Sequence, residues 1–549
     1  MSRFVALPQG VSEATFAKAI QEYRALLGEG RVRTDPGSLQ SYMKIMIPES
    51  EELHKPSAAM YPKTVKEIQA IVAIANKYKT PLWTVSTGKN MGYGSSAPAT
   101  RGQIVLDLKT MKKIIHVDEE LGYCLVEPGV TYYDLQQHFK KHKMNLWVDV
   151  PAPSAMASPM GNTADRGVGY TPYGEHFLFS CGMEVVLANG DVIRTGTGGV
   201  PNSTSWQANK WGYGPYVDGI FTQSNYGILT KLGVWLMKGP PPGGYFPFLM
   251  KFPKVEMLAD IIKTLMPLRL AQIIPNACIV VNAGWEAAGY FTYDKNGKGT
   301  NRETFYKGKD SLPPKVFQQI MDKYDVGAWN FYAAVYGSPE QVALNWKYVS
   351  GAFKAKFGNQ VRIITEKEAK DDPIFEYRRQ LMMGGSTLQE FGLYNWRGGG
   401  GSMWFAPVAA ARPSECDRQM RLATEVLNKY GFDYVSEFIV GWRDMHHIID
   451  LLYDRTDREE MNKAYKCFDE LLTVFTNNGW GTYRTNTAFM DKVSHSYGPG
   501  MRDIHYRLKR ALDPNNILAP GKSGIDLNPH NPGYAFNEGL NHGRPLDVP

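Results

Sequence analysis

Glycine-rich loops that follow short β-rich runs are the feature that most constrains this chain. They occupy residues 86–94, 127–130, 158–163 and 219–227. Loops with little side-chain bulk let successive backbone N–H groups converge on a phosphate without the help of a helix dipole. Each loop alone is most simply a turn, because glycine is the default turn residue. Together the loops predict a binding site for a large anionic ligand.

Two nucleotide-binding motifs are excluded by their context. Residues 92–97 match GxGxxA, but that fingerprint requires a helix to begin there, so that the helix N-terminus meets the pyrophosphate. Pro98 and Gly102 follow instead, and no helical period begins. Residues 521–523 (GKS) match the end of a P-loop, yet Asn516 stands where the motif requires an earlier glycine. We therefore expect neither a Rossmann nor a Walker site.

Hydrophobic periodicity predicts an α+β fold. Ser12 is expected to cap a first helix that stops at Gly28, and Asn189-Gly190 is expected to join a hairpin. The segment 239–244 (GPPPGG) is the clearest domain boundary, and the chain after Pro520 is expected to be extended. The predicted helices include 314–324, 338–355, 414–430 and 457–476, and the predicted strands include 82–85, 104–108, 114–117, 123–126, 183–187, 192–195, 329–336 and 403–407.

Composition excludes several classes of protein. The net charge of +7 is spread without a dense Lys/Arg run, which disfavours nucleic-acid binding. No apolar run is long enough for a transmembrane helix, and the N-terminal apolar run is too short for a signal peptide. Five cysteines without a CxxC argue against a disulfide framework or a zinc site, so we expect buried thiols and no metal. Aromatic residues make up 12% of the chain, which suits an aromatic-lined pocket.

Longer segments resemble the vanillyl-alcohol oxidase / p-cresol methylhydroxylase family of flavoproteins. The resemblance spans about residues 8–526 and is nearest to the cresol-dehydrogenase branch through residues 388–402. It implies an FAD-binding domain built from both chain ends (1–240 and 485–549) with an inserted α+β cap domain (241–484). The matching segments are 83–94 (WTVSTGKNMGYG), 126–131 (VEPGVT), 165–174 (DRGVGYTPYG), 388–402 (LQEFGLYNWRGGGGS) and 513–524 (DPNNILAPGKSG).

The resemblance also implies how FAD is held. Tyr394 matches the tyrosine whose phenolic oxygen is linked covalently to the flavin 8α-methyl in the cresol branch. Oxidase relatives use a histidine from a nearby strand, where this chain has Ser402. The other residues expected to bind the cofactor are Ser86, Thr87, Gly88, Lys89, Asn90, Met91, Gly92, Pro128, Gly129, Gly161, Asn162, Gly227, Ile228 and Lys522.

Six residues match the family's catalytic groups. Tyr93, Tyr483 and Arg484 match a clamp for a phenolate oxygen, and hydrogen-bond donors with a positive charge are the groups that lower a phenol's pKa. Glu390, Glu437 and His446 match residues near the benzylic carbon, where a base must assist the attack of water. Which of these three is the base stays open.

The function implied is a para-alkylphenol dehydrogenase that hydroxylates the benzylic carbon. In the family, a hydride passes to FAD, water attacks the resulting p-quinone methide, and a c-type cytochrome subunit takes the electrons. This chain has no CxxCH of its own, so a haem would sit on a partner. The family further implies a homodimer and the bacterial periplasm, although without a visible signal peptide the cytoplasm stays the alternative.

Two other functions stay open. One is a para-alkylphenol oxidase that uses O₂ and releases H₂O₂. Oxidases of the family carry an aspartate after a Val-Pro pair, whereas Val150-Pro151 is followed here by Ala152. The other is a flavin- or phenol-binding protein without turnover.

Overall fold

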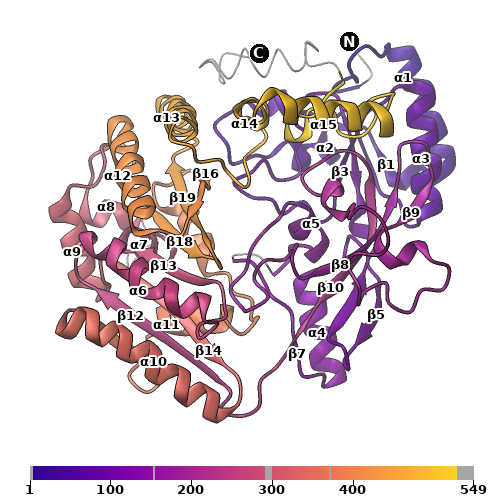
Figure 1. The fold of residues 1–549 in the computed structure, drawn as a ribbon. Helices are drawn as coiled ribbons and strands as arrows, with labels where there is room; N and C mark the ends of the chain where they lie inside the picture. The colour runs from indigo at the N-terminus through magenta and orange to yellow at the C-terminus, as the bar shows by residue number, and fades with distance from the viewer. Residues whose placement is uncertain (1–3, 153–154, 291–299, 370–371, 528–549) are drawn as a thin grey trace.

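The computed structural model describes residues 4–152, 155–290, 300–369 and 372–527, and these form two lobes (Figure 1). The first lobe combines the N-terminal half of the chain with two late helices, α14 (Met490–Ser496) and α15 (Pro499–Leu512). The middle of the chain forms the second lobe, as the α+β two-domain prediction requires. The domain limits at 240 and 484 stay predictions. Most of the segment expected to be extended, residues 528–549, lies outside the described residues.

The first sheet of the N-terminal lobe has the strand order β1-β2-β4-β3. Strand β4 is parallel to both neighbours, and β1 is antiparallel to β2. The C-terminal segment joins its open edge: the Leu82 N–H donates to the Ile517 carbonyl at 2.7 Å, and the Ala519 N–H donates to the Leu82 carbonyl at 2.8 Å. Both chain ends thus build one lobe. The strands are β1 (Val32–Arg33), β2 (Ala58–Met60), β3 (Leu82–Val85) and β4 (Ile104–Asp107).

The second sheet of this lobe is antiparallel, in the order β5-β6-β10-β8-β9. Strands β8 and β9 form the predicted hairpin. Strands β7 and β11 pair separately, and β11 leads into the segment 239–244. The bounds are β5 (Ile114–Asp118), β6 (Tyr123–Val126), β7 (Leu146–Trp147), β8 (Ser180–Val186), β9 (Val192–Arg194), β10 (Ile228–Trp235) and β11 (Met237–Lys238).

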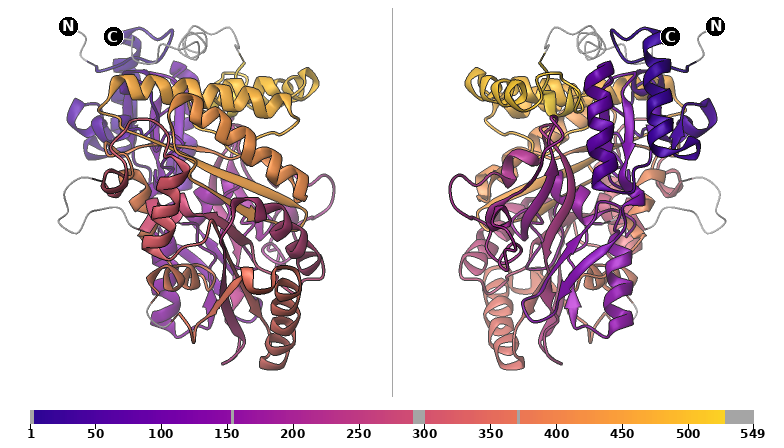
Figure 2. Two further views of the ribbon diagram at one scale, coloured as in Figure 1. Left: turned by 90° about the vertical axis from the view of Figure 1, so that its left-hand side faces the viewer. Right: turned by 90° about the vertical axis from the view of Figure 1, so that its right-hand side faces the viewer.

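Helices cover the outer side of the N-terminal lobe, as the right-hand view of Figure 2 shows. The Ser12 side chain caps α1, which ends before Gly28, so the predicted start and stop are confirmed. Apolar faces of α1 and α3 share one core with β2, β3 and β4. The helices are α1 (Glu13–Leu27), α2 (Pro36–Met43), α3 (Val65–Tyr78), α4 (Tyr132–His142) and α5 (Pro159–Ala164).

The second lobe is built on an antiparallel sheet in the order β15-β12-β14-β13-β18-β19-β16, with β17 paired to β19. The predicted strand 329–336 is β14, and the predicted strand 403–407 overlaps β16, which begins and ends two residues earlier. The bounds are β12 (Tyr245–Phe252), β13 (Cys278–Asn282), β14 (Trp329–Tyr336), β15 (Arg362–Thr365), β16 (Gly401–Phe405), β17 (Val408–Ala410), β18 (Ser436–Val440) and β19 (Asp444–Tyr453).

Side chains alternate between the two faces of this sheet, as the pleat of a β-strand requires. On β18, Phe438 and Val440 enter the core under helices α6, α10, α12 and α13, whereas Ile439 faces the opposite core. That opposite core also contains Tyr93 and Tyr170 of the first lobe, so this face of the sheet meets the N-terminal lobe. The helices are α6 (Leu258–Leu270), α7 (Ala283–Tyr290), α8 (Asn301–Phe305), α9 (Pro314–Tyr324), α10 (Pro339–Phe357), α11 (Pro373–Leu381), α12 (Pro413–Tyr430) and α13 (Arg458–Asn477).

The structure also bears on three sequence-based expectations, which concern a Rossmann motif, the cysteines and a transmembrane helix. Residues 92–97 form turns, not a helix start, which agrees with the rejection of a Rossmann motif. All five cysteines are buried free thiols. Within the described ranges, no helix is both long enough and apolar enough to cross a bilayer.

Candidate active site

A hollow with a cavity volume of about 300 Å³, partly open to solvent, is lined by both lobes. Its wall brings together segments that lie far apart in the sequence, from Trp83 to Lys522. Most of the residues predicted from the sequence lie on it. These are Ser86, Thr87, Gly88, Lys89, Asn90, Met91, Tyr93, Pro128, Gly161, Asn162, Gly227, Glu390, Tyr394, Glu437, Tyr483, Arg484 and Lys522.

Glycine is required where the loop after β3 runs along this hollow. Gly88 has φ +66°, and a Cβ there would lie 2.1 Å from the Ser96 Oγ. Gly92 has φ +72°, and a Cβ there would lie 2.1 Å from the Trp404 ring. Both positions combine a left-handed backbone with close packing, which only glycine tolerates without strain. The two glycines thereby set the course of the loop along the hollow, where its backbone N–H groups could bind a phosphate.

A chain of polar contacts joins this loop to the C-terminal segment. The Lys522 Nζ lies 3.0 Å from the Asp165 Oδ1, and the Asn90 Nδ2 donates to the Asp165 Oδ2 at 2.9 Å. The Asn90 Oδ1 in turn accepts a hydrogen bond from the Arg484 Nη2 at 2.8 Å. Burial opposes ionisation of Asp165, but Lys522 and Arg484 outweigh it and lower the pKa of that carboxyl. Asp165 therefore binds Lys522 directly and is linked to Arg484 through Asn90.

Tyr93, Tyr483 and Arg484 converge in the hollow. The Arg484 guanidinium carbon lies 4.1 Å from the Tyr93 ring centre and 5.8 Å from that of Tyr483. Burial raises the pKa of Tyr93 well above its usual value, so its hydroxyl stays a donor. Burial works against the charge of Arg484, but the two tyrosines and Asp165 raise its pKa. Two hydroxyls and a permanent cation are the groups that stabilise an oxyanion.

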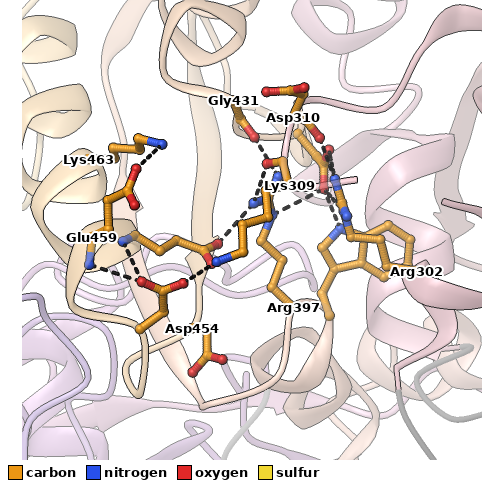
Figure 3. A network of polar contacts seen from close by, with 12 residues as sticks. Arg302, Lys309, Asp310, Arg397, Gly431, Asp454, Glu459 and Lys463 are labelled. Atoms are coloured by element: carbon orange, nitrogen blue, oxygen red, sulfur yellow. Dashed lines mark hydrogen bonds and ion pairs between the residues drawn. The ribbon is translucent and has the colours of Figure 1, made fainter. Parts of the chain in front are cut away.

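Tyr394 enters the hollow from the 3-10 helix η8 (Gln389–Asn395), and a charged network fixes the residues that follow it (Figure 3). The Trp396 Nε1 donates to the Asp433 Oδ2 at 2.9 Å. The Arg397 side chain donates to Glu460 at 2.9 Å and to the Gly431 carbonyl at 2.5 Å. This anchoring holds the end of η8 against the segment that follows α12 and against the start of α13. Burial, followed by the charges of Asp450 and Glu390, raises the pKa of Tyr394 well above its usual value.

Glu390 and Glu437 face the hollow from η8 and β18 and share a buried partner, Arg378 of α11. The Arg378 Nη1 lies 3.4 Å from the Glu390 Oε1 and 3.6 Å from the Glu437 Oε2. The Tyr377 hydroxyl donates a short hydrogen bond to Glu390. Burial, opposed by Arg378, raises the pKa of Glu437 to about 8. Glu437 can therefore exchange a proton near neutral pH.

Four predicted residues do not line the main hollow. The His446 ring stacks on Tyr483, with 4.4 Å between ring centres, and lines a second, smaller hollow whose wall shares Val168 and Ile439 with the first. Gly92 packs beneath Trp404, and Gly129 lies against the Lys109 carbonyl. Ile228 is buried in the core of the N-terminal lobe.

The sequence reasoning missed several residues at the site. Arg378 and Glu286 carry no local motif, and only the packing of α7 and α11 beside η8 brings them to the carboxylates. Trp285 and Trp404 line the hollow, and the Trp404 Nε1 donates to the Met91 carbonyl at 3.2 Å. Asp165 lies inside a segment that resembles the family, so the 165–174 string was a usable signal.

Comparison with known proteins identifies the class of this site. Residues 56–196 match the family model described as an FAD binding domain, and residues 321–523 match the C-terminal domain of FAD linked oxidases. The chain is 53% identical to the 4-cresol dehydrogenase [hydroxylating] flavoprotein subunit of Pseudomonas putida, over 95% of this chain and 98% of that protein. The hollow with its glycine loop is thus the site of an FAD-dependent oxidoreductase.

Comparison with solved structures narrows the class of FAD-dependent oxidoreductase to one family. The crystal structure of p-cresol methylhydroxylase with substrate bound superposes with a TM-score of 0.92 at 52% identity, covering 95% of this chain and 99% of that one. The 4-ethylphenol oxidase from Gulosibacter chungangensis, in its isoeugenol complex, superposes with a TM-score of 0.90 at 34% identity and the same coverage. The chain belongs to the vanillyl-alcohol oxidase / p-cresol methylhydroxylase flavoprotein family.

The residues present fit FAD. The loop of residues 86–91 and Lys522 lie on the same hollow as Tyr394. A pyrophosphate needs converging N–H groups and a cation, and an isoalloxazine needs an aromatic-lined cleft. The loop and Lys522 meet the first need, and Trp285, Tyr394 and Trp404 meet the second.

Proposed function

We propose that this protein is a para-alkylphenol dehydrogenase that hydroxylates the benzylic carbon with oxygen from water. The observation that carries the proposal is the convergence of Tyr93, Tyr483 and Arg484 with Glu390 and Glu437 in the hollow that Tyr394 enters. The relatives named for 4-cresol and p-cresol chemistry support it.

We propose that these residues act at two ends of the substrate, the phenol oxygen and the benzylic carbon. At one end, Tyr93, Tyr483 and Arg484 bind the phenol oxygen and favour its phenolate, whose charge drives electron density towards the benzylic carbon. FAD, when bound, accepts the hydride from that carbon. At the other end, a carboxylate of Glu390 or Glu437 takes the proton of the water that attacks the p-quinone methide.

The flavin is proposed to be attached through the phenolic oxygen of Tyr394. We expect the wild-type protein to keep its flavin absorbance through acid precipitation, and Tyr394→Phe to bind FAD but release all of it to the supernatant. Tyr434→Phe is a matched control, because Tyr434 is a half-buried tyrosine of the same lobe whose hydroxyl contacts His447. Precipitable flavin in Tyr394→Phe would show that the attachment site is elsewhere.

The electron acceptor is proposed to be a c-type cytochrome subunit. The chain resembles a protein named as the flavoprotein subunit of an enzyme, which supports a separate electron-carrying partner. We expect rapid anaerobic reduction of the flavin by 4-methylphenol, slow reoxidation in air and fast reoxidation by a one-electron acceptor.

A para-alkylphenol oxidase is the second candidate, since the 4-ethylphenol oxidase shares the fold at 34% identity. Fast reoxidation in air with one peroxide released per flavin would replace the dehydrogenase with this oxidase. Failure of any 4-alkylphenol to reduce the flavin would contradict both.

A further inference from the structure

Behind the proposed substrate site, three buried glutamates surround one buried arginine. Glu286 comes from α7, Arg378 from α11, Glu390 from η8 and Glu437 from β18. Arg378 is fully buried, and each glutamate is 2% exposed. Glu390 and Glu437 line the hollow, whereas Arg378 and Glu286 stand behind them. Charged side chains from four separate elements thus lie close together.

The charges of this cluster do not balance. A single guanidinium can compensate one buried carboxylate, and a second or third ionised carboxylate would lie uncompensated in a low-dielectric interior. Burial raises the pKa of all three glutamates, and Arg378 opposes that rise in each. The other titratable groups that interact with these four residues are Tyr170, Tyr332, Asp372, Tyr377, Tyr394 and Asp450. At neutral pH the cluster therefore favours one ionised carboxylate beside Arg378.

Arg378 is held so that it serves both hollow-facing carboxylates. Its Nη1 points at Glu390 and Glu437, at 3.4 and 3.6 Å. Its guanidinium carbon lies 5.3 Å from the Tyr332 ring centre and 4.7 Å from that of Tyr377. Among the described residues, its Nε and Nη2 have no hydrogen-bond partner, and neither has the Glu286 Oε1. The Nη1 thus donates a hydrogen bond to Glu390 and acts on the Glu437 Oε2 through its charge, and the two rings hold the guanidinium between them.

We propose that Arg378 is a positioning residue that keeps one carboxylate of the Glu390–Glu437 pair ionised, so that the resting site holds a base for the attacking water. This inference rests on the proposed function. In the step it supports, a lone pair of the water oxygen forms the bond to the benzylic carbon, and the exocyclic C=C electrons return to the ring and restore the phenolate. The water's proton passes to the carboxylate, which becomes a carboxylic acid.

The fate of 4-ethylphenol reports on this step without depending on the overall rate. Its p-quinone methide has two outcomes: water adds to give 1-(4-hydroxyphenyl)ethanol, or the methyl group loses a proton while the oxygen gains one, which gives 4-vinylphenol. Both outcomes release a proton to a base, but only the first requires that base to lie beside a bound water. The ratio of alcohol to vinylphenol therefore reports whether water is activated at the benzylic carbon, and the rate of anaerobic flavin reduction measures hydride transfer separately.

The test compares two variants that change the cluster's charge in opposite directions. In Arg378→Met, loss of an adjacent opposite charge should shift the pH at which the alcohol forms upward by about 1–3 units, so that vinylphenol dominates at pH 7. In Glu286→Gln, loss of a neighbouring acid should shift it downward. Flavin reduction should change far less than the product ratio in both.

Arg379→Met is the matched control. Arg379 is the next residue of α11, pairs with Glu376 at 2.7 Å and has a side chain that is 26% exposed. This variant should keep the wild-type product ratio and pH profile. If Arg378→Met does not fold, Glu286→Gln keeps the inference testable, because an unchanged or upward-shifted pH profile in that variant would contradict it. Arg378→Lys, which keeps the charge, should keep most of the alcohol.

Two outcomes would overturn the inference. One is an unchanged product ratio and pH profile in Arg378→Met, and the other is a shift of both Arg378→Met and Glu286→Gln in the same direction, as general damage to the cavity would produce. A wild-type flavin that 4-ethylphenol does not reduce would instead count against the proposed function, so the two failures are distinguishable.

Discussion

The two sides of the active-site hollow are built on different principles. On the FAD side, the loop of residues 86–94 acts through its backbone, and its glycines are needed for their φ angles and for close packing. On the cap side, Glu286, Arg378, Glu390 and Glu437 act through buried charges contributed by four elements. The first kind of site is encoded within about ten consecutive residues, whereas the second depends on how distant elements pack.

This difference decides what the sequence could predict. The helices at 314–324, 338–355, 414–430 and 457–476 correspond to α9, α10, α12 and α13, because amphipathic period and capping residues are local. The glycine-rich loops could be predicted for the same reason, because each is encoded by a few consecutive residues. The strand order of the second lobe could not be predicted, because antiparallel pairing of β13 with β18 joins residues more than 150 positions apart.

The same limit applies to the site itself. Tyr394 and Glu390 were predicted because a long motif carries both, and Tyr93 lies in another such motif. Arg378 lies on an ordinary amphipathic helix, where an arginine is usually exposed, and nothing nearby in the sequence says that it is buried. Only the tertiary packing turns it into the counter-charge of the hollow.

Substitution of Arg484 tests whether the two sides of the hollow act as one site, and it should have the largest effect on catalysis. It contacts Asn90 of the cofactor loop and lies over Tyr93, so it belongs to both sides. Arg484→Met should lower the rate of flavin reduction by 4-methylphenol about 100- to 1000-fold, since removal of one oxyanion donor typically costs that much. Stopped-flow reduction at saturating substrate measures it.

The control for that prediction is Arg443→Met, an exposed arginine of the β18–β19 turn. It should reduce at the wild-type rate. An Arg484→Met protein that loses only affinity, with an unchanged limiting rate of reduction, would mean that Arg484 binds substrate without stabilising the developing charge.

Gly92 tests the claim that the FAD side depends on backbone geometry. Gly92→Ala places a Cβ at φ +72° and 2.1 Å from the Trp404 ring, so both strain and a displaced indole are expected. We expect a loss of stability of about 1–3 kcal/mol, together with weaker flavin binding. Thermal unfolding and flavin titration of the apoprotein measure the two effects.

Gly190→Ala is the matched control for Gly92→Ala. Gly190 has φ +88°, but a Cβ at this position would meet nothing within 4 Å, so the variant carries the conformational cost without the clash. It should bind flavin normally and lose less stability than Gly92→Ala. Equal losses in the two variants would mean that the contact with Trp404 contributes nothing.

Substitutions at helix caps should have the smallest effect on stability, and this effect should be the same in both lobes. Thr131 caps α4 in the first lobe and Ser338 caps α10 in the second, and both form reciprocal capping boxes with the residue three positions later. Thr131→Ala and Ser338→Ala should each cost about 1 kcal/mol, because one backbone N–H loses its partner at each helix start. Thermal unfolding measures both losses, and replacement by Asp, which also caps, should restore most of that stability. A loss of stability confined to one lobe would show that helix capping there depends on tertiary packing. The helices, like the active site, would then differ between a part determined by nearby residues and a part determined by distant ones.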